Sequence, residues 1–247
     1  MTILEELKVA VIKLNHEDLK LLKLSSLFVF FVMLAAFLLF SCSTIRHEVH
    51  PKISDEKTYT VASWYGQDFH GRPTASGEIF NMYSNTCAHK EYPFGTKIKV
   101  TNISNSRGVE CIVNDRGPFV DGRDIDLSYA AAKEIGLVGP GTGKVLLEVS
   151  GRDESYIRKV KIQTTEKTGL FAIQAGSFTE GINAVRLKRS LNLKFSNVYI
   201  QEAELKGTTF YRVRIGNFDN FNSAVSIAEQ LGQEGYQTIV MKADVKI

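Results

Sequence analysis

The sequence has little excess charge of either sign. It carries 30 Lys and Arg residues against 27 Asp and Glu residues, a formal net charge of +3 over 247 residues, and the basic residues are scattered along the chain. Nucleic-acid-binding domains concentrate basic residues on one face or in one segment, so the sequence predicts no nucleic-acid partner. The hydrophobic content of 44% is that of an ordinary globular protein, and the length allows one large domain or two small ones plus tails.

Cysteine is scarce as well, with residues only at positions 42, 87 and 111. His47 and His50 lie three residues apart, but the sequence shows no clear four-ligand spacing of Cys, His and Asp. A structural zinc site usually takes four such ligands at short spacings. We therefore predict no metal and no cofactor, and we assign the two histidines to a solvated tether.

Residues 24–40 form an apolar run without charge, preceded by Lys20 and Lys23. At about 17 residues this run is short for a membrane-spanning helix and slightly long for the core of a signal peptide. It ends in Leu39-Phe40-Ser41-Cys42, which resembles a bacterial lipobox, the motif whose cysteine is lipidated and becomes the mature N-terminus. We expect residues 1–42 to be a signal and lipoprotein segment lipidated at Cys42; the alternatives are an uncleaved N-terminal anchor and a start site further along the chain.

In each of these alternatives, residues 43 onward are exported. Residues 43–57 are polar and charged and predict a tether. Ser43, which follows the cysteine, carries none of the acidic signal that favours retention in the inner membrane. The expected location is therefore the cell envelope, with a lipid anchor in the outer membrane facing the periplasm.

Residues 58–150 form the first predicted domain. Period-2 alternation and glycine-rich turns predict strands over residues 59–65, 97–103, 109–114 and 143–149. Residues 129–136 predict a short helix that Ser128 caps and Gly136 ends. Several short strands with one short helix predict a small, closed or nearly closed barrel.

Asp115 stands at the end of the strand predicted over residues 109–114. Alternation puts it on the same face as Val109, Cys111 and Val113, while Arg116 points away. Gly117-Pro118 then ends the strand. A carboxyl group held against an apolar surface has a raised pKa, which suits a general acid. The alternative is a turn in which Asp115 hydrogen-bonds its own backbone.

Residues 151–167 are mostly polar and predict a linker, and residues 168–247 contain a repeat of 40 residues. Each copy holds a strand, a Gly-x-Phe turn, an amphipathic helix and a further strand. This βαββαβ order predicts a four-stranded antiparallel sheet with both helices on one face. Fold class is thus mainly β for the first domain and α+β for the second.

The face of that sheet without helices is a natural binding platform. Strand alternation places Gln174 and Gly176 on this open face, with Arg212 and Arg214 of the second copy beside them. Ser177 is expected at the adjoining turn and Phe210 at the edge. Amide, hydroxyl and guanidinium donors beside an aromatic ring suit a sugar with acetamido and carboxylate groups, although ordinary solvated sheet positions would show the same pattern.

Residues 62–149 closely resemble the rare lipoprotein A family, whose domain is a six-stranded double-psi β-barrel. The resemblance rests on motifs at residues 62–66, 69–72, 74–78, 88–89, 93–96, 100–102, 114–119, 122–123 and 126–128. Residues 168–247 resemble the SPOR domain, through Gln174, residues 176–178 and Arg212. Together the two resemblances cover about two thirds of the chain.

This resemblance implies a septal lytic transglycosylase. The family cleaves the β-1,4 bond between N-acetylmuramic acid and N-acetylglucosamine in peptidoglycan, leaves a 1,6-anhydro end and prefers denuded strands, which lack stem peptides. The SPOR domain binds the same strands. The implied setting is daughter-cell separation, with peptidoglycan as partner and septal division proteins as further candidates. The alternative function is an expansin-like envelope lipoprotein that binds peptidoglycan without cutting it, since one fold hosts both activities.

The matching motifs carry over three catalytic candidates, Asp115, His89 and Glu78. A glycoside hydrolase needs two carboxyl groups, but a transglycosylase uses the sugar's own C6 hydroxyl as nucleophile, so one carboxyl group serves as acid and then as base. We expect Asp115 to fill this role, with Glu78 and His89 orienting the sugar or tuning the pKa of Asp115. The alternatives are a backbone hydrogen bond for His89 and a solvated turn for Glu78.

The expected substrate-binding residues of the first domain are Trp64, Tyr65 and Arg116. The two aromatic rings could stack on sugars or fill the barrel. The sequence departs from the family at Cys87 and Cys111. Three interpretations of this pair stay open: a disulfide, which an exported protein permits, two small buried hydrophobic residues, and a Cys–His–Asp metal site, for which no clear four-ligand spacing is present.

Overall fold

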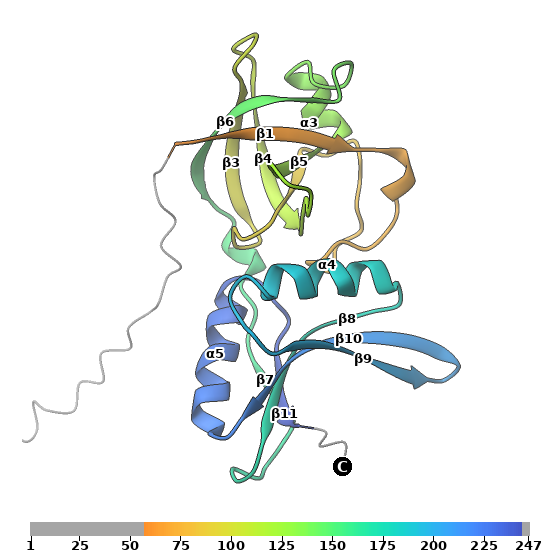
Figure 1. Cartoon of the computed structure of the whole chain (residues 1–247), viewed down its shortest axis with the longest axis vertical. Helices are drawn as coiled ribbons and strands as arrows, with labels where there is room; N and C mark the ends of the chain where they lie inside the picture. The colour runs from red at the N-terminus through yellow and green to blue at the C-terminus, as the bar shows by residue number, and fades with distance from the viewer. Residues whose placement is uncertain (1–56, 244–247) are drawn as a thin grey trace, which may run out of the picture. The chain divides into compact units, whose positions relative to one another are not determined.

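The computed structural model describes residues 57–243 (Figure 1). Six strands close a barrel in the order β1-β5-β2-β4-β3-β6. Their bounds are Thr58–Tyr65 (β1), Thr86–His89 (β2), Thr96–Asn102 (β3), Gly108–Asp115 (β4), Arg123–Ser128 (β5) and Thr142–Arg152 (β6). The predicted barrel is confirmed, and it contains two strands, β2 and β5, that alternation along the sequence did not show.

Alternation explains why the other strands form. In β3, Ile98 and Val100 are buried and Lys99 between them is exposed, as expected for a strand with one face in the core. The short helix α3 (Tyr129–Glu134) begins where predicted, because the Ser128 hydroxyl accepts the N–H of Ala131. Gly136 follows with a φ of +73°, a conformation that favours glycine. Residues 126–128, which directly precede this helix, belong to β5.

The predicted linker contains regular structure in three places. β6 runs on to Arg152, a 3-10 turn η2 covers Glu154–Tyr156, and β7 covers Lys161–Ile162. β7 pairs in parallel with β11 of the repeat domain. The linker predicted over residues 151–167 therefore contains short stretches of regular structure.

The repeat domain has the predicted βαββαβ order. Its elements are β8 (Phe171–Phe178), α4 (Gly181–Leu191), β9 (Val198–Leu205), β10 (Thr208–Phe218), α5 (Phe221–Gln233) and β11 (Ile239–Lys242). The sheet has five strands in the order β7-β11-β8-β10-β9, because β7 adds to its edge. The predicted sheet of four antiparallel strands is thus corrected to a mixed sheet of five.

A β-bulge changes the expected parity of β8. The register shifts between Val213 and Arg214, so that Gly176 pairs with Val213 rather than lying on the open face. A Cβ atom at Gly176 would approach Leu187 of α4 to 2.6 Å, so Gly176 faces the helices and leaves room for that side chain. Ser177, expected in a turn, is still within β8.

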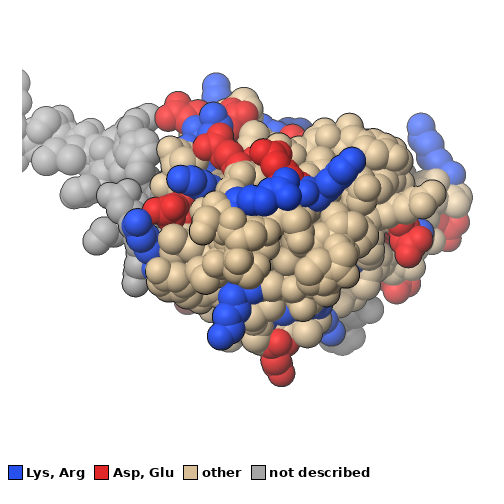
Figure 2. All heavy atoms as spheres, turned by 90° about the horizontal axis from the view of Figure 1, so that it is seen from above, with Lys and Arg blue, Asp and Glu red and all other residues tan. Residues whose placement is uncertain are grey.

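Charged side chains of both signs share the face of the molecule seen in Figure 2, where Lys and Arg lie next to Asp and Glu. The predicted signal segment, Cys42 and most of the tether lie outside the described residues. Among residues 57–243, no helix has the length and hydropathy of a membrane span.

Candidate active site and sheet groove

Asp115 ends β4 and is buried, with 7% of its surface exposed. Its Oδ1 atom accepts the backbone N–H of Ala75 at 2.9 Å and that of Arg116 at 2.8 Å. Burial raises the pKa of this carboxyl group, and the two N–H donors and the nearby guanidinium of Arg186 only partly offset that effect. Asp115 therefore holds its proton to a higher pH than an exposed aspartate does, as a general acid requires.

The loop over residues 74–78 supplies one of those donors. It is a tight turn in which Thr74 and Glu78 are bonded through their backbones, and Gly77 has a φ of +91°. The turn is fixed to the end of β4, because the Ser76 N–H donates to the carbonyl of Asn114 at 3.2 Å. This loop therefore positions Ala75 against Asp115.

Glu78 lies at the other side of the same strand end. Its Oε2 atom accepts the side-chain amide of Asn114 at 2.9 Å. It also hydrogen-bonds Tyr156, whose pKa is raised, first by burial and then by Glu78. Glu78 is therefore half-buried and held in place, rather than a freely solvated turn residue, but it does not line the cleft of Asp115.

A narrow cleft opens beside Asp115. Its walls come from the barrel and from α4, and its volume of about 10 Å³ is about that of one water molecule. Tyr65 lines it, with its ring 4.3 Å from that of Phe80 between centroids. Trp64 points elsewhere and meets the edge of Tyr129 at 5.8 Å. Of the two aromatic candidates, only Tyr65 borders the cleft.

Helix α4 covers the cleft with polar side chains. Nη1 of Arg186 lies 4.0 Å from Oδ2 of Asp115, and the Asn183 amide donates to the carbonyl of Pro73 at 3.0 Å. Further along, the Ser190 hydroxyl donates to the carbonyl of Lys90 at 2.7 Å. At about 10 Å³, the cleft in this arrangement is too small to admit a sugar ring. No pattern in the sequence indicates this contact, which joins segments about 70 residues apart.

His89 lies outside the cleft. Its Nδ1 atom accepts the N–H groups of Glu91 at 3.1 Å and Tyr92 at 3.0 Å, and its ring stacks on that of Tyr92 with a centroid distance of 4.0 Å. Burial, followed by the charge of Arg116, lowers the pKa of His89 to about 3. The imidazole is therefore neutral at physiological pH. Its Nδ1 atom accepts hydrogen bonds from the backbone, as in the alternative to a catalytic role stated for His89 above.

Arg116 is buried, with 1% of its surface exposed. Its Nε atom donates to the Tyr236 hydroxyl at 2.9 Å, Nη1 donates to the carbonyl of Tyr92 at 3.0 Å, and the guanidinium lies 3.7 Å from the centre of the Phe94 ring. The structure thus leaves no surface of Arg116 for the expected contact with substrate. Its side chain instead joins the barrel to the segment that follows α5.

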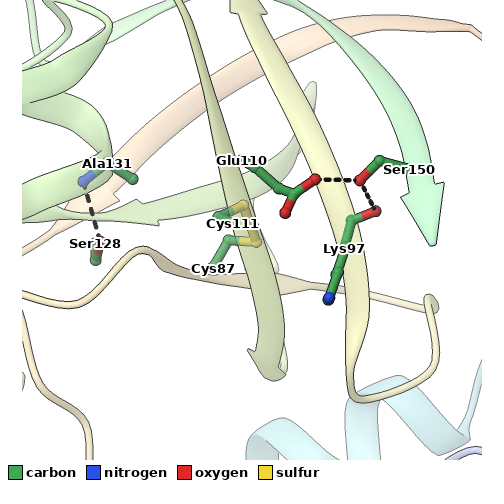
Figure 3. Close-up of a disulfide and its surroundings, with 7 residues drawn as sticks. All are labelled: Cys87, Lys97, Glu110, Cys111, Ser128, Ala131 and Ser150. Atoms are coloured by element: carbon green, nitrogen blue, oxygen red, sulfur yellow. Dashed lines mark hydrogen bonds between the residues drawn. A yellow bond between two sulfur atoms is a disulfide. The ribbon is translucent and has the colours of Figure 1, made fainter. Parts of the chain in front are cut away.

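Cys87 and Cys111 form a disulfide, and both are fully buried (Figure 3). The bond ties β2, which carries His89, to β4, which carries Asp115, with 5.9 Å between the Cα atoms. The pair of cysteines that the sequence left open is therefore a disulfide set in the apolar interior of the barrel.

A second site lies on the open face of the repeat domain, in a groove of about 230 Å³ that we call the sheet groove. Four of the six residues predicted for this platform line the groove, and Gly176 and Arg214 do not. The lining consists of the predicted Gln174, Ser177, Phe210 and Arg212, together with Gln163, Leu205, Ile239 and Met241, which the sequence did not indicate. The structure therefore brings the predicted amide, hydroxyl, aromatic and guanidinium groups to one place. Within residues 57–243, no three His, Cys, Asp or Glu side chains are clustered as a metal site would need.

Comparison with known proteins gives two family matches. Residues 58–147 match a domain described as lytic transglycolase, and residues 167–242 match the SPOR domain. The chain is 36% identical over 201 residues to the endolytic peptidoglycan transglycosylase RlpA of Vibrio cholerae, which covers 80% of this chain and 74% of that protein. It is 38% identical over 188 residues to the protein of the same name from Pasteurella multocida, covering 76% and 62%. Over 91 residues it is 53% identical to the Campylobacter jejuni RlpA, covering 37% and 33%.

Proposed function

The chain belongs to the RlpA family of endolytic peptidoglycan transglycosylases, and we propose that it cleaves the β-1,4 bond between N-acetylmuramic acid and N-acetylglucosamine in denuded glycan strands, with Asp115 as the catalytic acid and base. The observation that carries this proposal is the buried carboxyl group at the cleft, whose pKa is raised by that burial.

One carboxyl group is sufficient for the reaction. Protonated Asp115 gives its proton to the glycosidic oxygen as the bond from C1 of the muramic acid breaks. The C6 hydroxyl of the same sugar attacks C1, and the Asp115 carboxylate takes the hydroxyl proton. The products are a 1,6-anhydro end and a free N-acetylglucosamine hydroxyl, and Asp115 is protonated again. No water is activated, so no second carboxyl group is needed in the cleft.

Glu78 and His89 act as positioning residues in this proposal. Glu78 fixes the Asn114 side chain next to Asp115. The His89 carbonyl accepts Nη1 of Arg116 at 3.4 Å, and the backbone N–H of Arg116 binds Asp115. Both residues thus support the strand end that aims the catalytic carboxyl group, and neither needs to touch the sugar.

The deciding experiment is mass analysis of the products after purified protein is incubated with denuded glycan strands. Fragments with 1,6-anhydro ends support the transglycosylase. Bound but uncut strands would instead establish the expansin-like alternative, in which the same barrel holds glycan without cleaving it.

We propose that the sheet groove holds the denuded strand. The free lactyl carboxylate of muramic acid pairs with Arg212 when no stem peptide is attached to it, which accounts for a preference for stripped strands. Gln174, on the neighbouring strand β8, hydrogen-bonds the acetamido group, and the Phe210 ring packs on a sugar face.

The double variant Gln174→Ala, Arg212→Ala is expected to lose binding to denuded strands, because both polar anchors of the groove are removed. The measurement is a pulldown on sacculi treated with an amidase, at low and high salt, since salt screens an exposed charge pair. A matched control is Lys133→Ala with Lys144→Ala, two exposed barrel positions. Undiminished binding by the groove variant would remove the sheet groove as the glycan site.

We also propose that Cys42 is lipidated and anchors the protein in the outer membrane of the cell envelope, where it works at the septum during daughter-cell separation. Replacement Cys42→Ala is expected to abolish incorporation of labelled fatty acid, because the lipid is attached through the thiol. Metabolic labelling measures this directly. Equal label in the variant and the parent protein would contradict the anchor, whereas labelling of the Cys87→Ala, Cys111→Ala variant should be unchanged.

A further inference from the structure

The segment between the barrel and the repeat domain is held firmly against the repeat domain. The N–H groups of Lys161 and Gln163 donate to the carbonyls of Thr238 at 3.0 Å and Val240 at 2.8 Å. The N–H of Arg158 donates to the carbonyl of Gly232 at 2.9 Å. The backbone of residues 158–163 is therefore a fixed edge of the sheet, and the side chains on it have defined places.

The register of the sheet shows where those side chains lie. Lys161 pairs with Ile239, Ile239 pairs with Gln174, and Gln174 pairs with Arg214. Residues that pair directly across a sheet share a face, so Lys161 belongs to the same open face as Gln174. Gln163, two residues further along, is also on this face and lines the sheet groove.

A second cavity, of about 400 Å³, adjoins the sheet groove. Gln174, Ser177 and Ile239 line both, so the two form one continuous trough across β7, β11 and β8. Arg158, Lys159 and Lys161 line the second cavity, and neither cavity has an aspartate or glutamate in its lining. Lys159 and Lys161 are exposed, and they form no ion pair with any residue that the structure describes. These cations are therefore available to an anionic ligand.

We propose that Arg158, Lys159 and Lys161 form a second subsite of the trough, which binds the lactyl carboxylate of a further muramic acid residue when the first is held by the sheet groove. This inference rests on the proposed role of that groove. A denuded strand carries one free carboxylate on every muramic acid, so a ligand that runs along the trough brings a second negative charge to the second cavity. The subsite selects strands that are stripped at neighbouring positions, because a stem peptide converts the carboxylate into a neutral amide.

The test compares binding by the full chain and by its Lys159→Gln, Lys161→Gln variant. Both side chains are exposed, so the folded structure is unchanged. The probes are purified denuded glycan strands and the same strands after chemical reduction of their lactyl carboxylates to alcohols. The variant loses the ion pairs that Lys159 and Lys161 form with a lactyl carboxylate of the bound strand. This loss is expected to raise the Kd for the charged strands about 3- to 10-fold at low salt. The Kd for the reduced strands is expected to stay within about 2-fold of that of the parent protein.

The matched control is Lys133→Gln with Lys144→Gln, which removes the same charge from exposed positions of the barrel. This control should bind both probes as the parent protein does. Equal affinity of the Lys159, Lys161 variant and the parent for charged strands would overturn the subsite while leaving the sheet groove intact. A matching loss in the barrel control would also overturn it, since the effect would then be one of net charge. If the parent itself fails to bind denuded strands, the proposed function of the groove fails with it.

Discussion

An Asp115→Asn protein is expected to bind denuded glycan normally and to form 1,6-anhydro ends at least about 10²-fold more slowly than the parent protein. The amide matches the carboxyl group in size, and its oxygen can still accept the N–H groups of Ala75 and Arg116. It cannot give a proton to the leaving oxygen or take one from the C6 hydroxyl. Product analysis over a time course measures the effect, and parental rates from a folded variant would exclude Asp115 as the acid.

The pH profile provides a second readout of the same assignment. The reaction needs protonated Asp115, so kcat/KM is expected to fall as pH rises through the raised pKa of this group. This fall of kcat/KM with rising pH should be absent from the residual activity of Asp115→Asn. A rate that rises with pH over this range would instead indicate a carboxylate acting as base or nucleophile in the free enzyme.

The thermal stability of Asp115→Asn serves as the control for folding, and the direction of its expected change follows from the raised pKa of Asp115. Because burial raises the pKa of Asp115 in the folded state, the folded chain loses stability as pH rises from the unfolded pKa through the folded pKa. The amide has no charge to desolvate. Asp115→Asn should therefore unfold at the same temperature as the parent or a higher one at neutral pH, and the difference should shrink on acidification. If the variant instead unfolds at a lower temperature than the parent at neutral pH, misfolding would explain its lost activity.

The position of Asp115 followed from the sequence because its cause is local. Alternation along β4 and the Gly117-Pro118 stop together leave the carboxyl group at a strand end beside the core. The strand β5 was missed for a different reason. β5 contains Asp124 and Asp126, a residue type that strands disfavour, and these are stabilised by Thr60 with Lys90 and by Ser63 of other segments.

The sheet groove shows the same division between local and distant causes. Gln174 and Arg212 share a face through the period of each strand, which the sequence displays. The edge strand β7 forms through its pairing with β11, in which Lys161 pairs with Ile239, 78 residues further along the chain. The contact of Arg186 with Asp115 also depends on how distant segments pack. Contacts of this kind leave no periodic trace in the sequence.

The remaining large effect concerns the disulfide between Cys87 and Cys111 (Figure 3). The bond closes a segment with a sequence separation of 24, and restricting a loop of that length in the unfolded chain stabilises the folded state by about 3.5 kcal/mol. Replacement of both cysteines by alanine is expected to lower the Tm by roughly 10 °C. Calorimetry of the oxidised protein measures this shift, with Cys42→Ala as the control that replaces a cysteine outside residues 58–150.

Reduction offers an independent check of the same bond. Dithiothreitol should lower the Tm of the parent and of Cys42→Ala, and it should leave the Cys87→Ala, Cys111→Ala variant unchanged. An equal effect on all three would show that the reagent acts elsewhere. The bond joins β2, which carries His89, to β4, which ends in Asp115. Activity of the variant should fall only over the temperature range in which the variant unfolds. The periplasm is an oxidising compartment in which such a bond persists, so this dependence on the disulfide matches a protein that works in the cell envelope.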